Sequence, residues 1–144
     1  MKSSRVRWRT DHHSHSSSLG NKYKALTVAN TYQGMSVDIG TRKSRLGRVT
    51  GGVSGPAIKP LTLRLAYEAS RAVKIPIIGL GGIEKAEDVM EYLIVGASAV
   101  QVGTANFSNP KACEDLVDAL EKECIKFKAL RINSLIATLD TNSA

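Results

Sequence analysis

The sequence predicts an α/β protein built on a parallel sheet, because short apolar runs alternate with stretches of helical periodicity. Three such pairs follow one another along the chain. The expected strands lie at 25–31 ("ALTVANT"), 75–82 ("IPIIGLGG") and 99–105 ("AVQVGTA"). Each strand ends in glycines, hydroxyls or amides, at the end where α/β enzymes hold their ligands. This recurrence predicts a ligand site at that edge of the sheet.

A stretch rich in glycine and proline, "TGGVSGPAIKP" at 50–60, lies between the first strand and the first helix. Glycine lets the backbone approach a bulky oxyanion closely, and a helix start offers unpaired N–H groups and the positive end of its dipole. The stretch therefore predicts a loop that meets an anion. The helix itself is expected over 61–73. Its apolar residues recur at helical spacing: Leu61, Leu65, Ala69 and Val73.

Two more helices are expected after the second and third strands. One covers 85–96, with Gly96 as its C-terminal cap. The other covers 109–127, where Pro110 suits a first helical turn. Two shorter helical pieces around 132–139 complete the expected elements.

Composition and charge limit the function classes. With 144 residues, 42% of them hydrophobic, the chain is long enough for one soluble domain with a core. Its apolar runs are shorter than the roughly 18 residues of a membrane span, so no membrane partner is expected. The net charge of +7 is concentrated before residue 49, where ten Lys and Arg accompany two acidic residues. Because few aromatic residues are interleaved with them, a solvated basic arm is favoured over nucleic-acid binding.

Residues 1–24 are predicted to form a disordered arm, since they are basic, rich in serine and without periodicity. His12, His13 and His15 cluster there without the carboxylate or thiol partners of a built metal site, so no metal is predicted. Whether this arm is native to the fold stays open. The folded domain is expected over 25–144.

Two cysteines, Cys113 and Cys124, lie in the last long helical stretch, and their spacing is not that of a metal pair. Reduced thiols are the simpler interpretation. The basic start of the chain is not followed by an apolar segment, so a secretory signal is not expected. A cytoplasmic location is predicted.

Three strands cannot close a (β/α)8 barrel, which needs eight strands and about 250 residues. The alternation alone agrees both with a small doubly wound sheet and with part of a barrel. Barrels often bind phosphate at the loops after their last two strands. The pattern "GLGG" at 79–82, followed one strand later by "VGTA" at 102–105, has that form. The glycine pattern therefore favours the last part of a barrel.

From Ala25 onward the sequence resembles the C-terminal part of dihydroorotate dehydrogenase, most closely the class 1 enzymes of the two-subunit, NAD-linked type. The motifs "GGVSGPAIKP", "IPIIGLGGI" and "GASAVQVGTANF" occur together and in the family's order. This resemblance implies an α/β fold that is the C-terminal portion of a (β/α)8 TIM barrel, namely its last three β/α units. It also implies FMN as cofactor and the oxidation of dihydroorotate to orotate in pyrimidine (UMP) biosynthesis.

The resemblance also implies roles for individual residues. Asn30 and Thr31 match the pair that touches the substrate. Lys59 is left out of the site, because solvent explains its place equally well. The implied FMN contacts are Gly55 against the cofactor, and the pairs Gly81, Gly82 and Gly103, Thr104 at its phosphate.

The sequence departs from the family in lacking the cysteine or serine base and the lysine that contacts the flavin. No catalytic residue is therefore assigned, and the chain alone is expected to be inactive. Alternatives are a non-catalytic flavin- or phosphate-binding module, one half of a split enzyme, or the related barrel domain of dihydropyrimidine dehydrogenase. The implied partners are dihydroorotate and orotate, an iron-sulfur/FAD electron-transfer subunit that uses NAD, and further copies of the full-length parent.

Overall fold

The computed structural model describes residues 24–142. The predictions of a disordered arm and of a histidine cluster lie outside these residues, apart from Lys24. None of the described helices is long and apolar enough to cross a membrane.

A three-stranded parallel sheet forms the centre of the molecule, with the strand order β1-β6-β7. The strands are β1 (Leu26–Val28), β6 (Ile77–Leu80) and β7 (Ala99–Gln101). Gly79 pairs with Val28 on one side and with Val100 on the other. The predicted parallel α/β sheet is confirmed, although each strand is shorter than the apolar run that predicted it.

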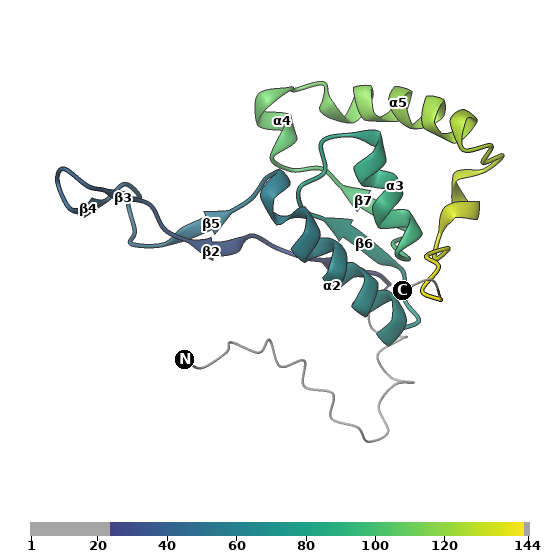
Figure 1. Cartoon of the computed structure of the whole chain (residues 1–144), viewed down its shortest axis with the longest axis horizontal. Helices are drawn as coiled ribbons and strands as arrows, with labels where there is room; N and C mark the ends of the chain where they lie inside the picture. Colours follow the sequence, from purple (N-terminus) through teal and green to yellow (C-terminus); the bar gives the residue numbers. More distant parts are fainter. Residues whose placement is uncertain (1–23, 143–144) are drawn as a thin grey trace, which may run out of the picture.

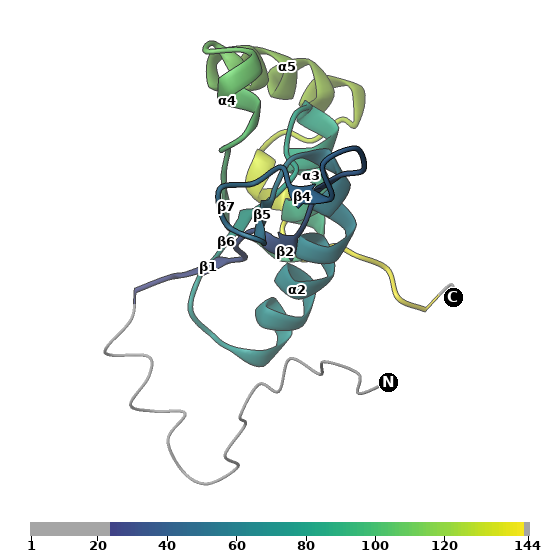
Figure 2. The same cartoon turned by 90° about the vertical axis from the view of Figure 1, so that its left-hand side faces the viewer.

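Helices cover one face of this sheet (Figure 1). α2 packs against β6 and β1, α3 packs beside α2 and against β7, and α5 packs on the outer side of α3. Figure 2 shows the same layers after a quarter turn. The helical elements are η1 (Pro56–Ile58), α2 (Lys59–Ala72), α3 (Ala86–Ile94), α4 (Ala105–Ser108), α5 (Ala112–Lys126) and η2 (Ile132–Leu135).

Some element bounds differ from those expected. α2 begins at Lys59, two residues earlier, because Pro60 is compatible with its first turn. The third strand ends at Gln101, since α4 already begins at Ala105. At the end of the chain a single turn of 3-10 helix replaces the two expected helical pieces.

The segment between β1 and η1, expected to be a loop, forms two antiparallel ribbons that project from the body (Figure 1). Strands of two or three residues are too short for their periodicity to be read from the sequence. Their partners also lie up to about twenty positions away. The paired strands are β2 (Tyr32–Gly34) with β5 (Gly51–Val53), and β3 (Val37–Asp38) with β4 (Lys43–Ser44).

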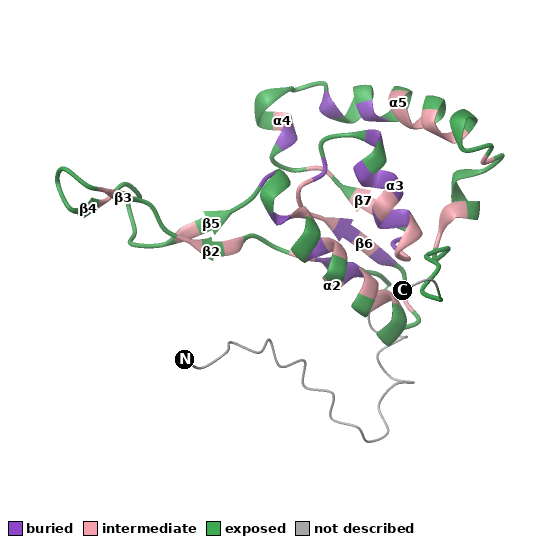
Figure 3. Ribbon diagram, in the orientation of Figure 1, coloured by how far each residue is buried: buried purple, intermediate pink, exposed green. Residues whose placement is uncertain are grey.

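The core lies between the sheet and the helices, as the buried residues of Figure 3 show. Tyr92 of α3 and Ile77 of β6 are among its largest fully buried side chains. On α2 the buried residues are Thr62 and Ala66. Leu61, expected on that face, is 47% exposed. Leu65 and Ala69 of the expected stripe do pack, half-buried, against the core, but its centre is shifted to Thr62 and Ala66. The Thr62 hydroxyl is accommodated there because it finds hydrogen-bond partners inside.

Within the described residues, the outer edges of β1 and β7 pair with no further strand. Unpaired parallel edges are templates for association with other chains. We expect the isolated chain to self-associate. Sedimentation velocity at increasing concentration should show oligomers, and a single cooperative monomer across that range would contradict this expectation.

Candidate functional site

A cavity of about 370 Å³ lies at the carboxyl ends of β1, β6 and β7. The four loops that line it come from positions 30–31, 54–58, 80–84 and 101–107, so the fold unites segments that are far apart in the sequence. All seven site residues predicted from the sequence line this one cavity: Asn30, Thr31, Gly55, Gly81, Gly82, Gly103 and Thr104.

The cavity offers backbone N–H groups in place of cationic side chains. Within the described part of the chain, no lysine or arginine lines it, and Glu84 is its one charged side chain. Four backbone N–H groups at the cavity, those of Gly81, Gly82, Gly103 and Thr104, have no hydrogen-bond acceptor among residues 24–142. They belong to the two pairs that the family resemblance assigns to the FMN phosphate. Oriented backbone donors of this kind bind anions without a cation.

The turn formed by Gly81 and Gly82 requires glycine, since their φ angles are +133° and +68°. The Gly81 carbonyl accepts a hydrogen bond of 2.8 Å from the buried Tyr92 hydroxyl. The Thr62 hydroxyl lies 3.3 Å from the same oxygen and is hydrogen-bonded to Tyr92. In a trans peptide the C=O and the next N–H point in opposite directions. The N–H of Gly82 is therefore directed away from the helices.

The Gly55 loop packs directly on this turn. Gly55 has a φ of +90°, so glycine is favoured there as well. A Cβ atom placed on Gly82 would lie 2.9 Å from the Gly55 carbonyl oxygen and 2.8 Å from Cβ of Lys59. The backbones of the two loops therefore pack closely, with no room for a side chain at Gly82.

Eight lining residues were not predicted from the sequence, and three of them, Ser54, Leu80 and Phe107, shape the cavity most clearly. Ser54 accepts a hydrogen bond of 2.8 Å from the Thr104 hydroxyl and thereby joins two loops 50 positions apart. Phe107 is 92% exposed at the cavity, and Leu80 adds an apolar wall. Nothing in the sequence marks Phe107 as exposed. The structure identifies it as a large apolar side chain outside the core, a feature that often marks a binding surface.

Asn30 and Thr31 lie at the end of β1, as predicted. The side-chain oxygen of Asn30 accepts a hydrogen bond of 2.7 Å from the N–H of Thr31. A Cβ atom on Gly52 would overlap the side chain of Thr31, so the projecting ribbon approaches this pair closely. The two residues line the same cavity as the glycine pairs, and their role toward a substrate stays a prediction.

Lys59, left out of the predicted site, does not line the cavity. Its Nζ lies 2.6 Å from Oδ1 of Asp88 and 3.0 Å from Oε1 of Glu91. Burial alone would lower the pKa of Lys59, but the hydrogen bonds to these carboxylates outweigh it and raise that pKa. For Asp88, burial favours the neutral acid, yet the hydrogen bonds from Lys59 and two backbone N–H groups lower its pKa.

We expect Asp88→Asn to reduce the free energy of unfolding by about 1–2 kcal/mol at neutral pH, because a charged hydrogen bond in a partly exposed site is lost. The folded pKa of Asp88 is lowered, so its contribution is complete above its ordinary value of 3.8 and is lost as the pH falls further. Urea unfolding at several pH values measures this. A difference between the two proteins that persists unchanged below pH 3 would contradict it.

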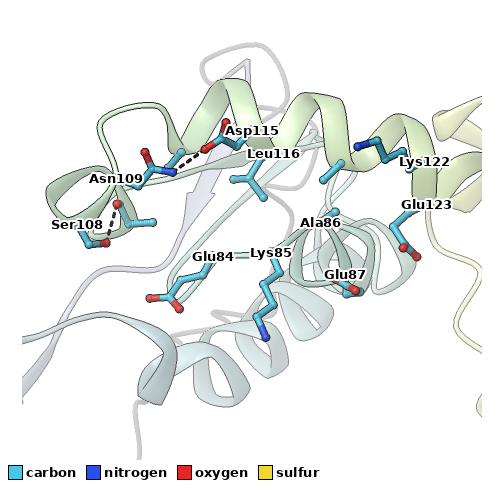
Figure 4. A pocket seen from close by; sticks show the side chains of 13 residues that line it. Glu84, Lys85, Ala86, Glu87, Ser108, Asn109, Asp115, Leu116, Lys122 and Glu123 are labelled. Carbon is cyan, nitrogen blue, oxygen red and sulfur yellow. Dashed lines mark hydrogen bonds between the residues drawn. The ribbon is translucent and has the colours of Figure 1, made fainter.

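A second, larger hollow of about 510 Å³ lies between α3 and α5 (Figure 4). Its floor is formed by small or apolar residues such as Ala86 and Leu116, and its rim by exposed charges of both signs. Asn109 donates a hydrogen bond of 2.6 Å to Asp115 across one end. This larger hollow contains none of the predicted site residues, so the smaller cavity is the candidate site.

The two cysteines do not line the cavity. Cys113 is exposed and Cys124 is half-buried, and both are free thiols. Among residues 24–142, no group of three or more His, Cys, Asp or Glu side chains is placed to hold a metal ion.

Comparisons with known proteins agree with the motifs. The family model for dihydroorotate dehydrogenase matches residues 10–124, so the match begins within the stretch predicted to be an arm. The dihydroorotate dehydrogenase B (NAD(+)) catalytic subunit of Trichlorobacter lovleyi is 47% identical over 116 residues, which are 81% of this chain and 38% of that protein. The corresponding subunit of Bacillus pumilus is 56% identical over 95 residues, which are 66% of this chain and 31% of that protein.

A solved structure gives the fold independently. DHODH from Eimeria tenella, crystallised in complex with ferulenol, superposes with a TM-score of 0.68 at 24% sequence identity. The match covers 84% of this chain and 32% of that one, which agrees with the predicted portion of a barrel. The chain spans about 38% of the length of the first curated relatives. By the extent of the family model and the identity to its relatives, the chain belongs to the dihydroorotate dehydrogenase family.

Proposed function

We propose that this chain is the C-terminal part of an FMN-dependent dihydroorotate dehydrogenase, acting in pyrimidine biosynthesis when the rest of the barrel is present. One observation carries the proposal above all. Four loops bring the seven predicted residues around one cavity that has unpaired backbone donors and no cation. Such a cavity suits the phosphate of a cofactor whose charge is met by N–H groups.

The residues present fit FMN at its phosphate end. The N–H groups of Gly81, Gly82, Gly103 and Thr104 would donate to the phosphate, and the positive φ of Gly55 allows close backbone approach. When bound, FMN supplies the acceptor for the hydride removed from dihydroorotate.

The substrate would be held from the same side of the cavity. Asn30 and Thr31 offer an amide and a hydroxyl at the end of β1, where polar groups of a pyrimidine and a carboxylate would find partners. This chain brings no assigned base to remove a proton from the substrate, so the proton transfer depends on sequence outside it.

Activity therefore requires the missing part of the barrel. The free edges of β1 and β7 are the places where further strands would pair. The same free edges also suit one alternative, in which this chain is one half of a split enzyme and pairs with a second chain. The comparisons name dihydroorotate dehydrogenases and so disfavour the dihydropyrimidine dehydrogenase alternative.

The partners of the complete enzyme are part of the proposal. The relatives are named as NAD(+)-type catalytic subunits, which supports an electron-transfer subunit with an iron-sulfur centre and FAD. We further propose a homo-oligomeric parent enzyme in the cytoplasm.

Two measurements test the function. The 144-residue chain should bind FMN weakly but more tightly than riboflavin, which lacks the phosphate, and should form no orotate from dihydroorotate. Refolding together with the unmatched N-terminal part of the Trichlorobacter lovleyi relative should restore flavin retention and orotate formation. Full turnover by this chain alone, or equal affinity for FMN and riboflavin, would overturn the proposal.

A further inference from the structure

A single carboxylate, that of Asp88, binds the end of the segment from Gly81 to Lys85. Oδ2 of Asp88 accepts hydrogen bonds from the N–H groups of Glu84 at 2.9 Å and Lys85 at 2.8 Å. Asp88 lies in the first turn of α3, and its side chain is only 12% exposed. The last residues of the glycine loop are thus fixed to the start of the helix that follows.

The same carboxylate connects this loop to α2. Its other oxygen, Oδ1, accepts a hydrogen bond of 2.6 Å from Nζ of Lys59, the first residue of α2. Glu91, one turn further along α3, accepts a second bond from Nζ at 3.0 Å. Lys59 follows η1, which begins directly after Gly55. The ion pair therefore connects the segment that follows the Gly55 loop with the segment that follows β6.

The backbone of Lys59 also lies against the glycine turn. A Cβ atom on Gly82 would be 2.9 Å from the backbone nitrogen of Lys59 and 2.8 Å from its Cβ. The ammonium group of Lys59 thus contacts α3, while the backbone nitrogen and Cβ of the same residue lie close to Gly82.

Lys59 does not itself receive the anion. Its Nζ is bound by two carboxylates, and the three side chains together carry a net negative charge. None of the three lines the cavity. Any influence of these groups on a bound phosphate is therefore exerted through the backbone that they hold.

We propose that Lys59 and Asp88 are positioning residues, whose ion pair holds the Gly81–Lys85 loop in the conformation that receives a phosphate group. The identity of that group as the phosphate of FMN rests on the function proposed above. The positioning of the loop rests on the contacts alone.

The test compares Lys59→Met with Arg64→Met in the full chain. Methionine keeps an unbranched apolar stem and removes the charge in both cases. Arg64 pairs with Glu68 on the exposed side of the same helix, so its variant is a matched control. Hydrogen exchange of the amides of Glu84 and Lys85, and titrations with FMN and with riboflavin, are measured for each.

Lys59→Met should accelerate exchange at the amides of Glu84 and Lys85 about tenfold and weaken FMN binding about tenfold, while riboflavin binding stays unchanged. Arg64→Met should do neither. If Lys59→Met loses its helical circular dichroism, Asp88→Asn replaces it, because the amide oxygen still accepts from the loop while the ion pair is lost. The same exchange and the same selective loss of FMN are expected.

Unchanged exchange at the amides of Glu84 and Lys85, or an equal loss of FMN and riboflavin binding, overturns the proposal. An unsubstituted chain that does not prefer FMN contradicts the proposed function. In that case the exchange comparison still decides whether the ion pair positions the loop.

Discussion

Replacing Gly82 with valine is expected to abolish flavin retention and to lower the free energy of unfolding by about 2–5 kcal/mol. At a φ of +68° a β-branched side chain is strained. Its Cβ would also lie within 2.9 Å of the Gly55 carbonyl oxygen and the Lys59 backbone nitrogen. Both atoms belong to backbone that is packed on its other side. The substitution therefore drives apart the two loops that form the cavity.

Gly47→Val is the matched control, because a Cβ atom there meets nothing within 4 Å and the φ angle is not left-handed. Urea unfolding should place this control within about 0.5 kcal/mol of the unsubstituted chain. Flavin fluorescence after refolding with the N-terminal part reports retention. Normal retention by the Gly82 variant would show that the glycine turn is not part of the flavin site.

The second large effect is expected from Tyr92→Ala, which should cost about 3–5 kcal/mol of unfolding free energy. The side chain is fully buried, and its ring fills the space over Gly79 in the middle of β6. The change leaves a cavity beneath the sheet and removes the donor to the Gly81 carbonyl. The free energy of unfolding and the affinity for flavin should therefore fall together, as urea unfolding and flavin titration would measure.

Tyr92→Phe separates these two contributions. The ring remains, and the Gly81 carbonyl keeps only Thr62 as a side-chain donor, so a loss of about 0.5–1.5 kcal/mol is expected. Tyr67 of α2 is half-buried and has an unbonded hydroxyl among the described residues, so Tyr67→Phe should be neutral. A Tyr92→Ala variant as stable as the Tyr67 control would contradict the assignment of Tyr92 to the core.

The sequence was sufficient to predict that six of the seven site residues meet at one edge of the sheet, because parallel strands place their carboxyl ends together. Gly55, which follows β5 outside that sheet, was assigned only by the family resemblance. The sequence could not predict what supports these residues. Thr62 looks out of place on an apolar helix face until Tyr92 and the Gly81 carbonyl are brought beside it. Lys59 looks like a solvated lysine, since its carboxylate partners lie 29 and 32 positions further along. Long-range polar contacts of this kind leave no periodic signal.

The projecting ribbons were missed for a related reason. β3 and β4 have two residues each, and glycine supplies two of the three residues of β5. Neither length nor β-propensity identifies such strands. The predicted loop at 50–60 was correct only around Ser54 and Gly55, since β5, η1 and the start of α2 occupy the rest of it.

The strand order has a consequence for how the chain acquires its structure. β6 and β7 pair residues only 21 positions apart, as Ile78 and Ala99 do, and α3 closes that connection locally. β1 must find β6 across 51 positions, from Leu26 to Ile77, with the whole ribbon looped out. Longer loops cost more closure entropy, and non-local pairings form later. We therefore expect the unit β6-α3-β7 to form before β1 pairs with β6, so that Asn30 and Thr31 reach the cavity last.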